Sequence, residues 1–311
     1  MKKLISVAIP AYNEEEVLDE LKKRLQNTAQ ICDQYDFEII ITENGSYDNT
    51  LAKLMAIHTE DPRFKIVKLS RNFGCDGGIA AALQYASGDA AVIMNADLQD
   101  PPEVIPEFIK KWEQGYEIVY GIIKRREGVS FTKRTLSYTF YKVIHRLTNK
   151  AIPENVSDFR LIDKKVYSII NQMGERNKFL RGMIAWTGFR QTGVPITRPK
   201  RFAGEAKGNK FFPVLNVALN GIFSFSYFPL RLAVVLGFLV SALSFLMGGI
   251  ELVEYFLHGS PVQGFTTTIV VILFLFGMQF FVIGIIGEYL ARVYDEAKAR
   301  PNFIVDTVIG F

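Results

Sequence analysis

Polar residues gather in four short segments within the first hundred residues of the chain. These segments are residues 10–14, 43–46 with Asp48, 71–72 and 95–100. In the last segment Asp97 stands two residues after Asn95, and their side chains offer the oxygen ligands that Mg²⁺ and Mn²⁺ prefer. A divalent cation held there would neutralise a diphosphate group. Asp and Asn are also ordinary turn residues, so this segment alone is weak evidence for a metal site. The other three polar segments strengthen that interpretation.

Each polar segment follows a short apolar run, and helical patterns separate the runs. The pattern predicts strands at 5–10, 37–42, 64–69, 90–94 and 118–120. It predicts helices at 14–32, 49–58, 77–86 and 102–112. Strands and helices that alternate in this way are typical of an α/β fold, a Rossmann-like, mostly parallel sheet with helices on both faces. Ligands of such sheets bind at the carboxyl ends of the strands, where all four polar segments would lie.

Two helix starts are predicted in detail. Asn13 stands where it can cap the first helix, and Glu16 is placed to complete a capping box with it. Asp100 precedes Pro101 and Pro102, so we expect its side chain to cap the next helix and not to bind a metal.

Motifs typical of one enzyme family are spread over essentially the whole chain. They lie in residues 9–15, 45–48, 69–74, 95–103, 157–163, 177–182, 188–190, 201–205 and two C-terminal apolar runs. In these motifs the chain resembles the inverting family-2 glycosyltransferases, which have the glycosyltransferase-A fold. More narrowly it is similar to the polyprenyl-phosphate glycosyltransferases, the group of the bactoprenol glucosyltransferases and dolichol-phosphate mannose synthases.

The resemblance implies a role for individual residues. The base and ribose of a nucleotide sugar would be bound by Pro10, Tyr12, Glu14 and Glu43, with Ser46 assisting and Asn95 and Asp97 nearer the diphosphate. Mg²⁺ or Mn²⁺ would be held by Asn95, Asp97 and Gln99. The catalytic group beside the donor sugar would be Asp97, Asp158 and Arg160. The phosphate of the acceptor would be bound by Arg126, Arg134, Arg198 and Arg201, because the arginine fork matches phosphate geometry.

This sequence departs from the family pattern at two of these positions. Asn95 stands where relatives usually have the first Asp of Asp-x-Asp, and Glu43-Asn44 stands where they have Asp-Asp. Asn95 keeps a carbonyl oxygen but removes one negative charge from the metal site. We therefore expect weaker metal binding.

The implied reaction moves a hexose, expected to be glucose from UDP-glucose, onto a polyprenyl phosphate with inversion. The acceptor phosphate is already anionic at neutral pH and needs no general base. Two alternatives stay open. One is an enzyme similar to dolichol-phosphate mannose synthases that uses GDP-mannose, and the other is a membrane-anchored protein that binds a nucleotide sugar without turnover.

Two apolar runs near the C-terminus predict membrane spans at 231–253 and 265–288. At a rise of about 1.5 Å per residue, each is long enough as a helix to cross the hydrocarbon layer, which is about 30 Å thick. A pair of buried core helices is the alternative. Lys and Arg flank the runs but are missing from the segment between them, residues 251–264, which predicts an outer loop at 254–264. The catalytic domain (1–210), the tail (289–311) and both termini would then be cytoplasmic, at the inner membrane of the cell.

Residues 211–230 predict helices that lie along the membrane surface, or else a core helix of the catalytic domain. The glycines of the apolar runs predict close helix packing in a homo-oligomer, in preference to a small channel. The net charge of +4 is too small to predict nucleic acid as a partner. Cys32 and Cys75 are the two cysteines, which excludes a disulfide framework and a structural zinc site.

Overall fold

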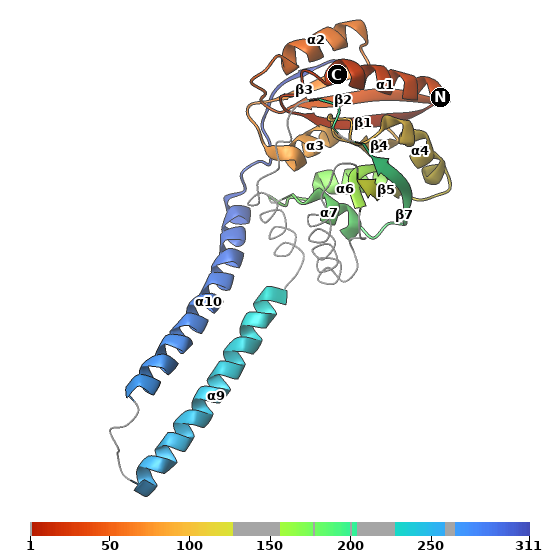
Figure 1. Cartoon of the computed structure of the whole chain (residues 1–311). Helices are drawn as coiled ribbons and strands as arrows, with labels where there is room; N and C mark the ends of the chain where they lie inside the picture. The colour runs from red at the N-terminus through yellow and green to blue at the C-terminus, as the bar shows by residue number, and fades with distance from the viewer. Residues whose placement is uncertain (1, 127–155, 177, 200, 204–227, 259–264) are drawn as a thin grey trace. The chain divides into compact units, whose positions relative to one another are not determined.

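The computed structural model describes residues 2–126, 156–176, 178–199, 201–203, 228–258 and 265–311 (Figure 1). The chain divides into two compact units. The first comprises residues 1–221 and 300–311, and the second comprises residues 222–299. The second unit is therefore an insertion between two parts of the first.

An eight-stranded sheet with the order β7-β5-β6-β4-β1-β2-β3-β8 forms the first unit. The strands are β1 (Lys3–Ala11), β2 (Tyr35–Glu43), β3 (Phe64–Leu69), β4 (Ala90–Ile93), β5 (Ile118–Arg126), β6 (Val156–Asp163), β7 (Gln191–Arg198) and β8 (Val305–Ile309). β6 pairs antiparallel with β4 and β5, and β8 pairs antiparallel with β3. The other neighbours pair in parallel. The predicted mostly parallel α/β sheet is confirmed.

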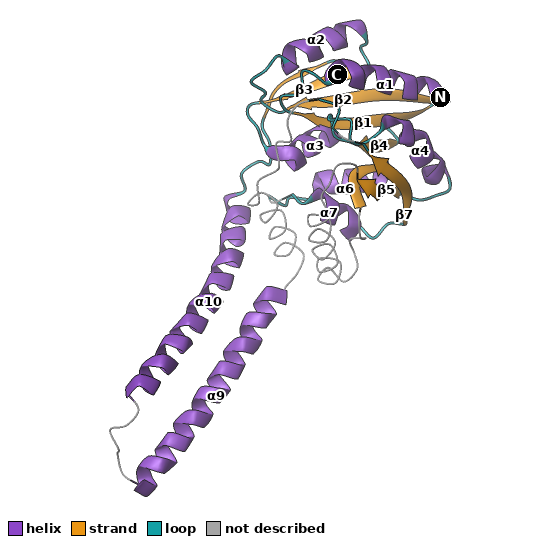
Figure 2. Ribbon diagram, viewed as in Figure 1, coloured by secondary structure: helices purple, strands orange, loops and turns teal. Residues whose placement is uncertain are grey.

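Helices cover both faces of this sheet (Figure 2). They are α1 (Leu18–Ile31), α2 (Thr50–Glu60), α3 (Gly74–Gln84), the short 3-10 helix η1 (Pro102–Val104), α4 (Ile105–Glu113), α6 (Lys164–Gln172) and α7 (Leu180–Trp186). α1 packs with α2 and α4, whereas α3 packs with α6, which in turn packs with α7. This arrangement leaves the carboxyl ends of the central strands free for the turns that carry the polar segments.

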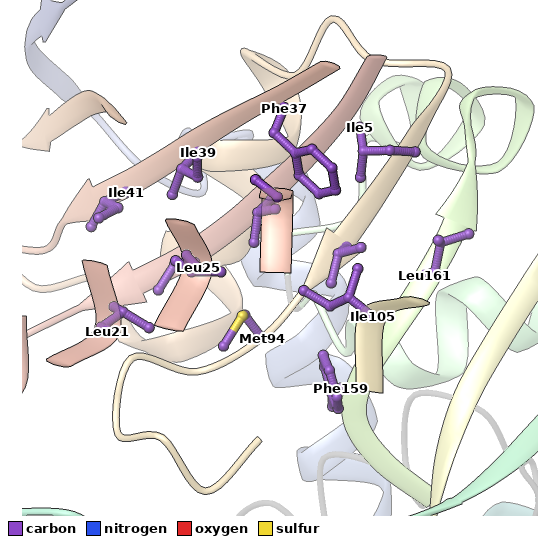
Figure 3. Packing of buried hydrophobic residues seen from close by; sticks show 14 of the residues in the cluster. Ile5, Leu21, Leu25, Phe37, Ile39, Ile41, Met94, Ile105, Phe159 and Leu161 are labelled. Atoms are coloured by element: carbon purple, nitrogen blue, oxygen red, sulfur yellow. The ribbon is translucent and has the colours of Figure 1, made fainter. Parts of the chain in front are cut away.

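The main core lies between the sheet and α1 and α4. Phe37, Ile39 and Ile41 alternate along β2 and point into it, because successive side chains of a strand face opposite sides. Leu21 and Leu25 of α1 lie opposite them (Figure 3). This buried cluster fixes the strands, and hence the turns at their ends.

The structure differs from the sequence prediction at the start of α1. The helix begins at Leu18, its N-cap residue is Val17, and no side-chain capping bond is formed within the described residues. The predicted capping box of Asn13 and Glu16 is therefore wrong. Asn13 instead has a left-handed backbone (φ 50°), and its Oδ1 accepts a hydrogen bond from the Tyr47 amide at 2.8 Å. The side chain therefore joins the segment after β1 to the segment after β2 and does not cap α1.

The second unit contains the helices α9 (Phe228–His258) and α10 (Phe265–Lys298). Two stretches of them, Pro229–Ile250 and Phe274–Lys298, are long and apolar enough to cross a membrane, and 6% and 0% of these stretches are buried. Large apolar side chains such as Phe238, Phe245 and Phe280 are exposed. That exposure is the opposite of what buried core helices require and suits contact with lipid.

The helices extend past the predicted spans. α10 continues through the first half of the predicted tail, and β8 takes up much of the second half. The predicted surface helices at 211–230 fall outside the described residues, except for the last three, with which α9 begins. The outer loop falls outside them from residue 259 onward.

Candidate functional site

The predicted nucleotide residues meet where β1 and β2 end side by side. Ala11 pairs with Glu43 in the ladder, so the turns after these strands are neighbours. The buried Glu43 accepts a hydrogen bond from the Ser46 amide at 2.5 Å, and Ser46 Oγ accepts one from the Asn13 amide at 3.0 Å. These bonds fix the turns on either side of a partly buried Tyr12.

Tyr47, which the sequence analysis did not single out, lies against Tyr12. The two rings meet edge to face with centroids 6.2 Å apart. Pro10, the remaining predicted nucleotide residue of β1, lies against α3, where a Cβ on Gly78 would come within 2.9 Å of its Cβ.

The turn after β2 also packs closely on the turn after β3. Gly45 has a φ of +70°, and a Cβ there would lie 2.7 Å from the carbonyl carbon of Arg71. A side chain at position 45 is disfavoured by the positive φ and would clash with the backbone of Arg71. The side chain of Asn44 adds two hydrogen bonds to this contact. Its Nδ2 donates to the carbonyl of Gly74 at 2.8 Å, and its Oδ1 accepts from the backbone amide of Phe73 at 2.9 Å. Three strand ends are thus bound into one surface.

The acidic turn after β4 is organised by Asp100. This side chain is fully buried, and its Oδ2 accepts hydrogen bonds from the Asn95 amide at 3.2 Å and from Asn95 Nδ2 at 3.0 Å. Its Oδ1 accepts one from Ser157 Oγ at 3.2 Å. The prediction that Asp100 caps the next helix is therefore wrong. Its carboxylate points inward, and η1 begins after Pro101 without a side-chain cap among the described residues.

Asp97 and Gln99 complete this turn. Asp97 Oδ1 accepts a hydrogen bond from the Gln99 amide at 3.1 Å, and Leu98 between them has a left-handed backbone with φ of 56°. Such a backbone is costly for a leucine, whose buried side chain holds it in place. The strained residue keeps Asp97 and Gln99 in a tight turn.

The antiparallel β6 brings Asp158 and Arg160 to the same place. Arg160 pairs with Ile93 at the end of β4, so the first residues of β6 lie beside the acidic turn. Arg160 is 4% exposed and donates to the carbonyl oxygens of Ser157 at 3.0 Å and of Asp158 at 3.3 Å. Burial lowers the pKa of Arg160 to about 10, which Asp158 opposes. The guanidinium is still protonated at neutral pH.

Two further charged residues, which the sequence analysis did not single out, surround Asp158. Arg181 of α7 binds its carboxylate at both oxygens, at 2.9 and 2.6 Å. Burial would raise the pKa of the Asp158 carboxyl, but Arg181 and Arg160 hold that pKa below its usual value. Asp76 of α3 has its pKa raised to about 7 by burial and by the charge of Asp158. Arg181 lies within a segment that the resemblance covers, whereas nothing in the sequence marks Asp76.

Arg198, the last residue of β7, and the described residues just after it also contact the site. Arg198 approaches Asp100 Oδ1 at 3.7 Å, and burial raises the pKa of Asp100 against this charge. Arg198 Nε is buried without a hydrogen-bond partner in the described part of the chain. The carbonyl of Pro199 accepts from Gln99 Nε2 at 3.3 Å. This segment therefore rests on the turn that carries the predicted metal ligands.

Arg201 contacts one of the predicted nucleotide residues. Its guanidinium forms an ion pair with Glu14 and donates through Nε to the carbonyl of Ala203 at 3.0 Å. Two of the predicted acceptor residues, Arg198 and Arg201, are thus brought to the site. The backbone of Arg126 pairs with that of Arg198, but its side chain and the whole of Arg134 lie outside the described residues.

The acidic turn suits a hard cation by its chemistry. Asn95, Asp97 and Gln99 all carry side-chain oxygens. The Nδ2 of Asn95 donates to Asp100, and its Oδ1 accepts a hydrogen bond from Cys75 Sγ, a weak donor, at 3.5 Å. No group of three or more His, Cys, Asp or Glu side chains that could hold a metal occurs among the residues described. A cation would therefore depend on amide oxygens and on the diphosphate as well as on Asp97.

Comparison with known proteins adds family matches over most of the chain. Residues 6–169 match the model of glycosyl transferase family 2, and residues 228–293 match the model of the GtrB C-terminal hairpin. The first match contains the turns after β1 to β4 and the start of β6. The second contains most of α9 and α10.

Curated relatives match over nearly the full chain. An uncharacterized glycosyltransferase of Synechocystis sp., sll0501, is 43% identical over 98% of this chain and 96% of its own length. The uncharacterized glycosyltransferase YkcC of Bacillus subtilis is 40% identical over 98% and 94%. The bactoprenol glucosyl transferase of Shigella phage SfV is 38% identical over 97% of both chains. A solved structure of glucosyl-3-phosphoglycerate synthase from Mycobacterium tuberculosis is 15% identical, with a TM-score of 0.47 over 71% of this chain and 78% of that one.

Proposed function

The chain belongs to glycosyl transferase family 2, and from this premise we propose that it transfers glucose from UDP-glucose to a polyprenyl phosphate. The relative whose name states both the sugar and the lipid is the phage bactoprenol glucosyl transferase. One structural observation carries the proposal. Two arginines that suit an acceptor phosphate reach the residues proposed for the donor. Arg201 forms an ion pair with Glu14, a proposed nucleotide residue, and Arg198 lies beside Asp100, which organises the acidic turn.

A lipid acceptor is supported by the second unit. α9 and α10 expose large apolar side chains along their length, and a transferase fixed to a bilayer meets its lipid substrate at the surface of that bilayer. β1 and β8 lie in one sheet, although α9 and α10 separate them in sequence. If α9 and α10 each cross the membrane, the chain after them returns to the same side of the bilayer as the chain before them. We propose the cytoplasm for that side, because Lys and Arg flank the spans and are missing from residues 251–264.

The chemistry that this site supports needs no general base. A polyprenyl phosphate is already an anion, and it attacks the anomeric carbon as the nucleotide diphosphate leaves, with inversion. Asp158 is bound at both oxygens by Arg181, so its role is to orient and not to accept a proton. The buried positive charge of Arg160 stabilises the negative charge that develops on the leaving group.

Asn95, Asp97 and Gln99 are the residues that would hold a divalent cation. Such a cation would supply positive charge to the diphosphate and would add to the charge of Arg160. Asn95 contributes an oxygen without a negative charge, so we propose that Mg²⁺ or Mn²⁺ is held weakly until the diphosphate supplies further ligands. The homo-oligomer stays a prediction from the glycines.

The experiment is transfer of labelled glucose from UDP-glucose to undecaprenyl phosphate by the purified full chain in detergent. We expect labelled lipid with Mg²⁺ or Mn²⁺ and its loss after chelation. Label that stays in the aqueous phase with UDP-glucose but reaches the lipid from GDP-mannose would replace the proposed donor. Tight binding of UDP with no transfer from either donor would favour the non-catalytic alternative.

A further inference from the structure

Arg181 of α7 and Asp158 of β6 form a two-point contact. Arg181 Nε donates to Asp158 Oδ1 at 2.9 Å, and Arg181 Nη2 donates to Oδ2 at 2.6 Å. A guanidinium that binds both oxygens of a carboxylate fixes its plane as well as its position. Asp158 can therefore not rotate freely at the start of β6.

The two partners differ in how much they face the solvent. The side chain of Asp158 is 44% exposed, whereas that of Arg181 is 18% exposed. A carboxylate has about four lone-pair sites, of which Arg181 occupies one on each oxygen. The remaining sites receive no hydrogen bond from the described residues, and sugar hydroxyl groups are donors that suit them.

Asp158 is also linked to the buried Arg160. Its Oδ1 lies 3.9 Å from Arg160 Nη2, and its own carbonyl accepts from Arg160 Nε. A carboxylate that shifted would alter the surroundings of a buried cation, which is expensive to leave without a compensating charge. The position of Asp158 thus bears on both the sugar side and the diphosphate side of the site.

We propose that Arg181 is a positioning residue for glycosyl transfer, which acts by fixing the Asp158 carboxylate so that its open oxygen positions receive the hydroxyl groups of the hexose. The inference rests on the proposed function and adds to it a residue that touches neither substrate. The contact comes from α7, so the short helix Leu180–Trp186 carries a part of the donor site.

The test compares Arg181→Ala and Arg181→Lys with a matched control, Arg63→Ala. Arg63 binds Asp61 with the same two-point geometry, at 2.9 and 2.7 Å, but at the amino end of β3, away from the turns of the site. Both Arg181 variants should lose about ten- to hundredfold in kcat for transfer, because a small misplacement of a positioning group has an effect of this size. Their Kd for UDP, which lacks the hexose, should stay within about twofold of wild type, and Arg63→Ala should keep its kcat.

Guanidinium rescue separates positioning from folding. Guanidinium chloride at low millimolar concentration should restore part of the kcat of Arg181→Ala, because the added ion can occupy the same carboxylate. It should not restore Asp158→Ala, which lacks that carboxylate. If wild type transfers sugar and Arg181→Lys does so at an unchanged kcat, the inference is wrong and the proposed function stands. If wild type transfers no sugar from any donor, both the inference about Arg181 and the proposed function are wrong.

Discussion

Asn95 gives Asp100 two hydrogen bonds, one from its backbone amide at 3.2 Å and one from its side-chain Nδ2 at 3.0 Å. The side-chain amide at position 95 therefore binds a buried carboxylate, in addition to its proposed role as a metal ligand. A carboxylate at position 95 would lose the Nδ2 donor and would face the Asp100 side chain, whose pKa burial already raises. The Asn at position 95, where relatives usually have Asp, is therefore matched in this chain by its hydrogen bonds to Asp100.

Asn95→Asp should accordingly lower the stability of the protein and raise its affinity for the metal. In chelator, we expect the free energy of unfolding to fall by about 1–3 kcal/mol, the usual effect of a buried group that loses its partner. The apparent affinity for Mg²⁺ in the presence of UDP should rise, because the site gains a negative charge. Thermal melts with and without Mg²⁺ measure both effects. Equal melting temperatures of variant and wild type in chelator would contradict the prediction.

The ion pair of Glu14 and Arg201 should couple the two substrate sides of the site. Their side chains are 11% and 17% exposed, so the pair is partly shielded from water. In a double-mutant cycle of Glu14→Gln and Arg201→Gln on UDP binding, we expect a coupling of about 1 kcal/mol or more. Lys53 and Asp19, an exposed pair at 2.9 Å, provide the control cycle, for which a few tenths at most are expected. Additive effects at Glu14 and Arg201 would exclude the coupling.

Asp76 should make the first unit less stable as the pH rises. Its pKa is raised to about 7 from 3.8, so the unfolded chain releases this proton at lower pH than the folded chain does. The folded state therefore loses stability between about pH 4 and pH 7, by at most about 4 kcal/mol in total. Above pH 7 the full loss is present, and below pH 4 there is none.

Asp76→Asn removes this titration. The melting temperature of the variant relative to wild type should therefore rise between pH 5 and pH 8. Asp36→Asn, at an exposed position of β2, serves as the control and should show a flat difference. A flat difference for Asp76→Asn would mean that the carboxyl is ionised throughout this range.

Removal of residues 302–311 should destabilise the first unit. These residues supply β8, a hydrogen bond from Asn302 Nδ2 to the carbonyl of Glu175 at 2.9 Å, and the ring of Phe311 packed 5.1 Å from that of Tyr85. Their loss leaves the edge of β3 unpaired, and we expect the melting temperature to fall by about 5 °C or more. A synthetic peptide of residues 301–311 should restore part of this loss, and failure to restore it would argue against strand pairing as the cause.

A point substitution is the control for that truncation. Asp306→Asn removes the surface ion pair with Lys68, 2.5 Å long, and leaves the strand intact. We expect a nearly unchanged melting temperature, because exposed pairs contribute little.

The sequence predicts the local parts of this architecture well. β3 is found at its predicted residues, and β1, β2 and β4 lie within a few residues of theirs, because alternating or continuous apolar runs report directly on burial in a sheet. The gathering of polar segments also follows, since parallel strands place their carboxyl ends together.

The parts that depend on distant pairing could not be predicted in the same way. Arg201 and Glu14 are 187 residues apart, and no periodicity links them. β6 enters the sheet in reverse, and β8 adds an edge after two long helices. Local rules failed at Asn13 and Asp100 for a related reason. A side chain suited to cap a helix is equally suited to join two strand ends, and tertiary contacts decide between these uses.

The late position of β8 in the chain sets an order on biosynthesis. The ribosome makes β3 long before β8, and both membrane helices are made in between. Until β8 has been made, the β3 edge has an open row of backbone donors and acceptors. During that time the edge can pair with a strand of a neighbouring nascent chain. Completion of the sheet therefore requires that both long apolar helices have already been synthesised.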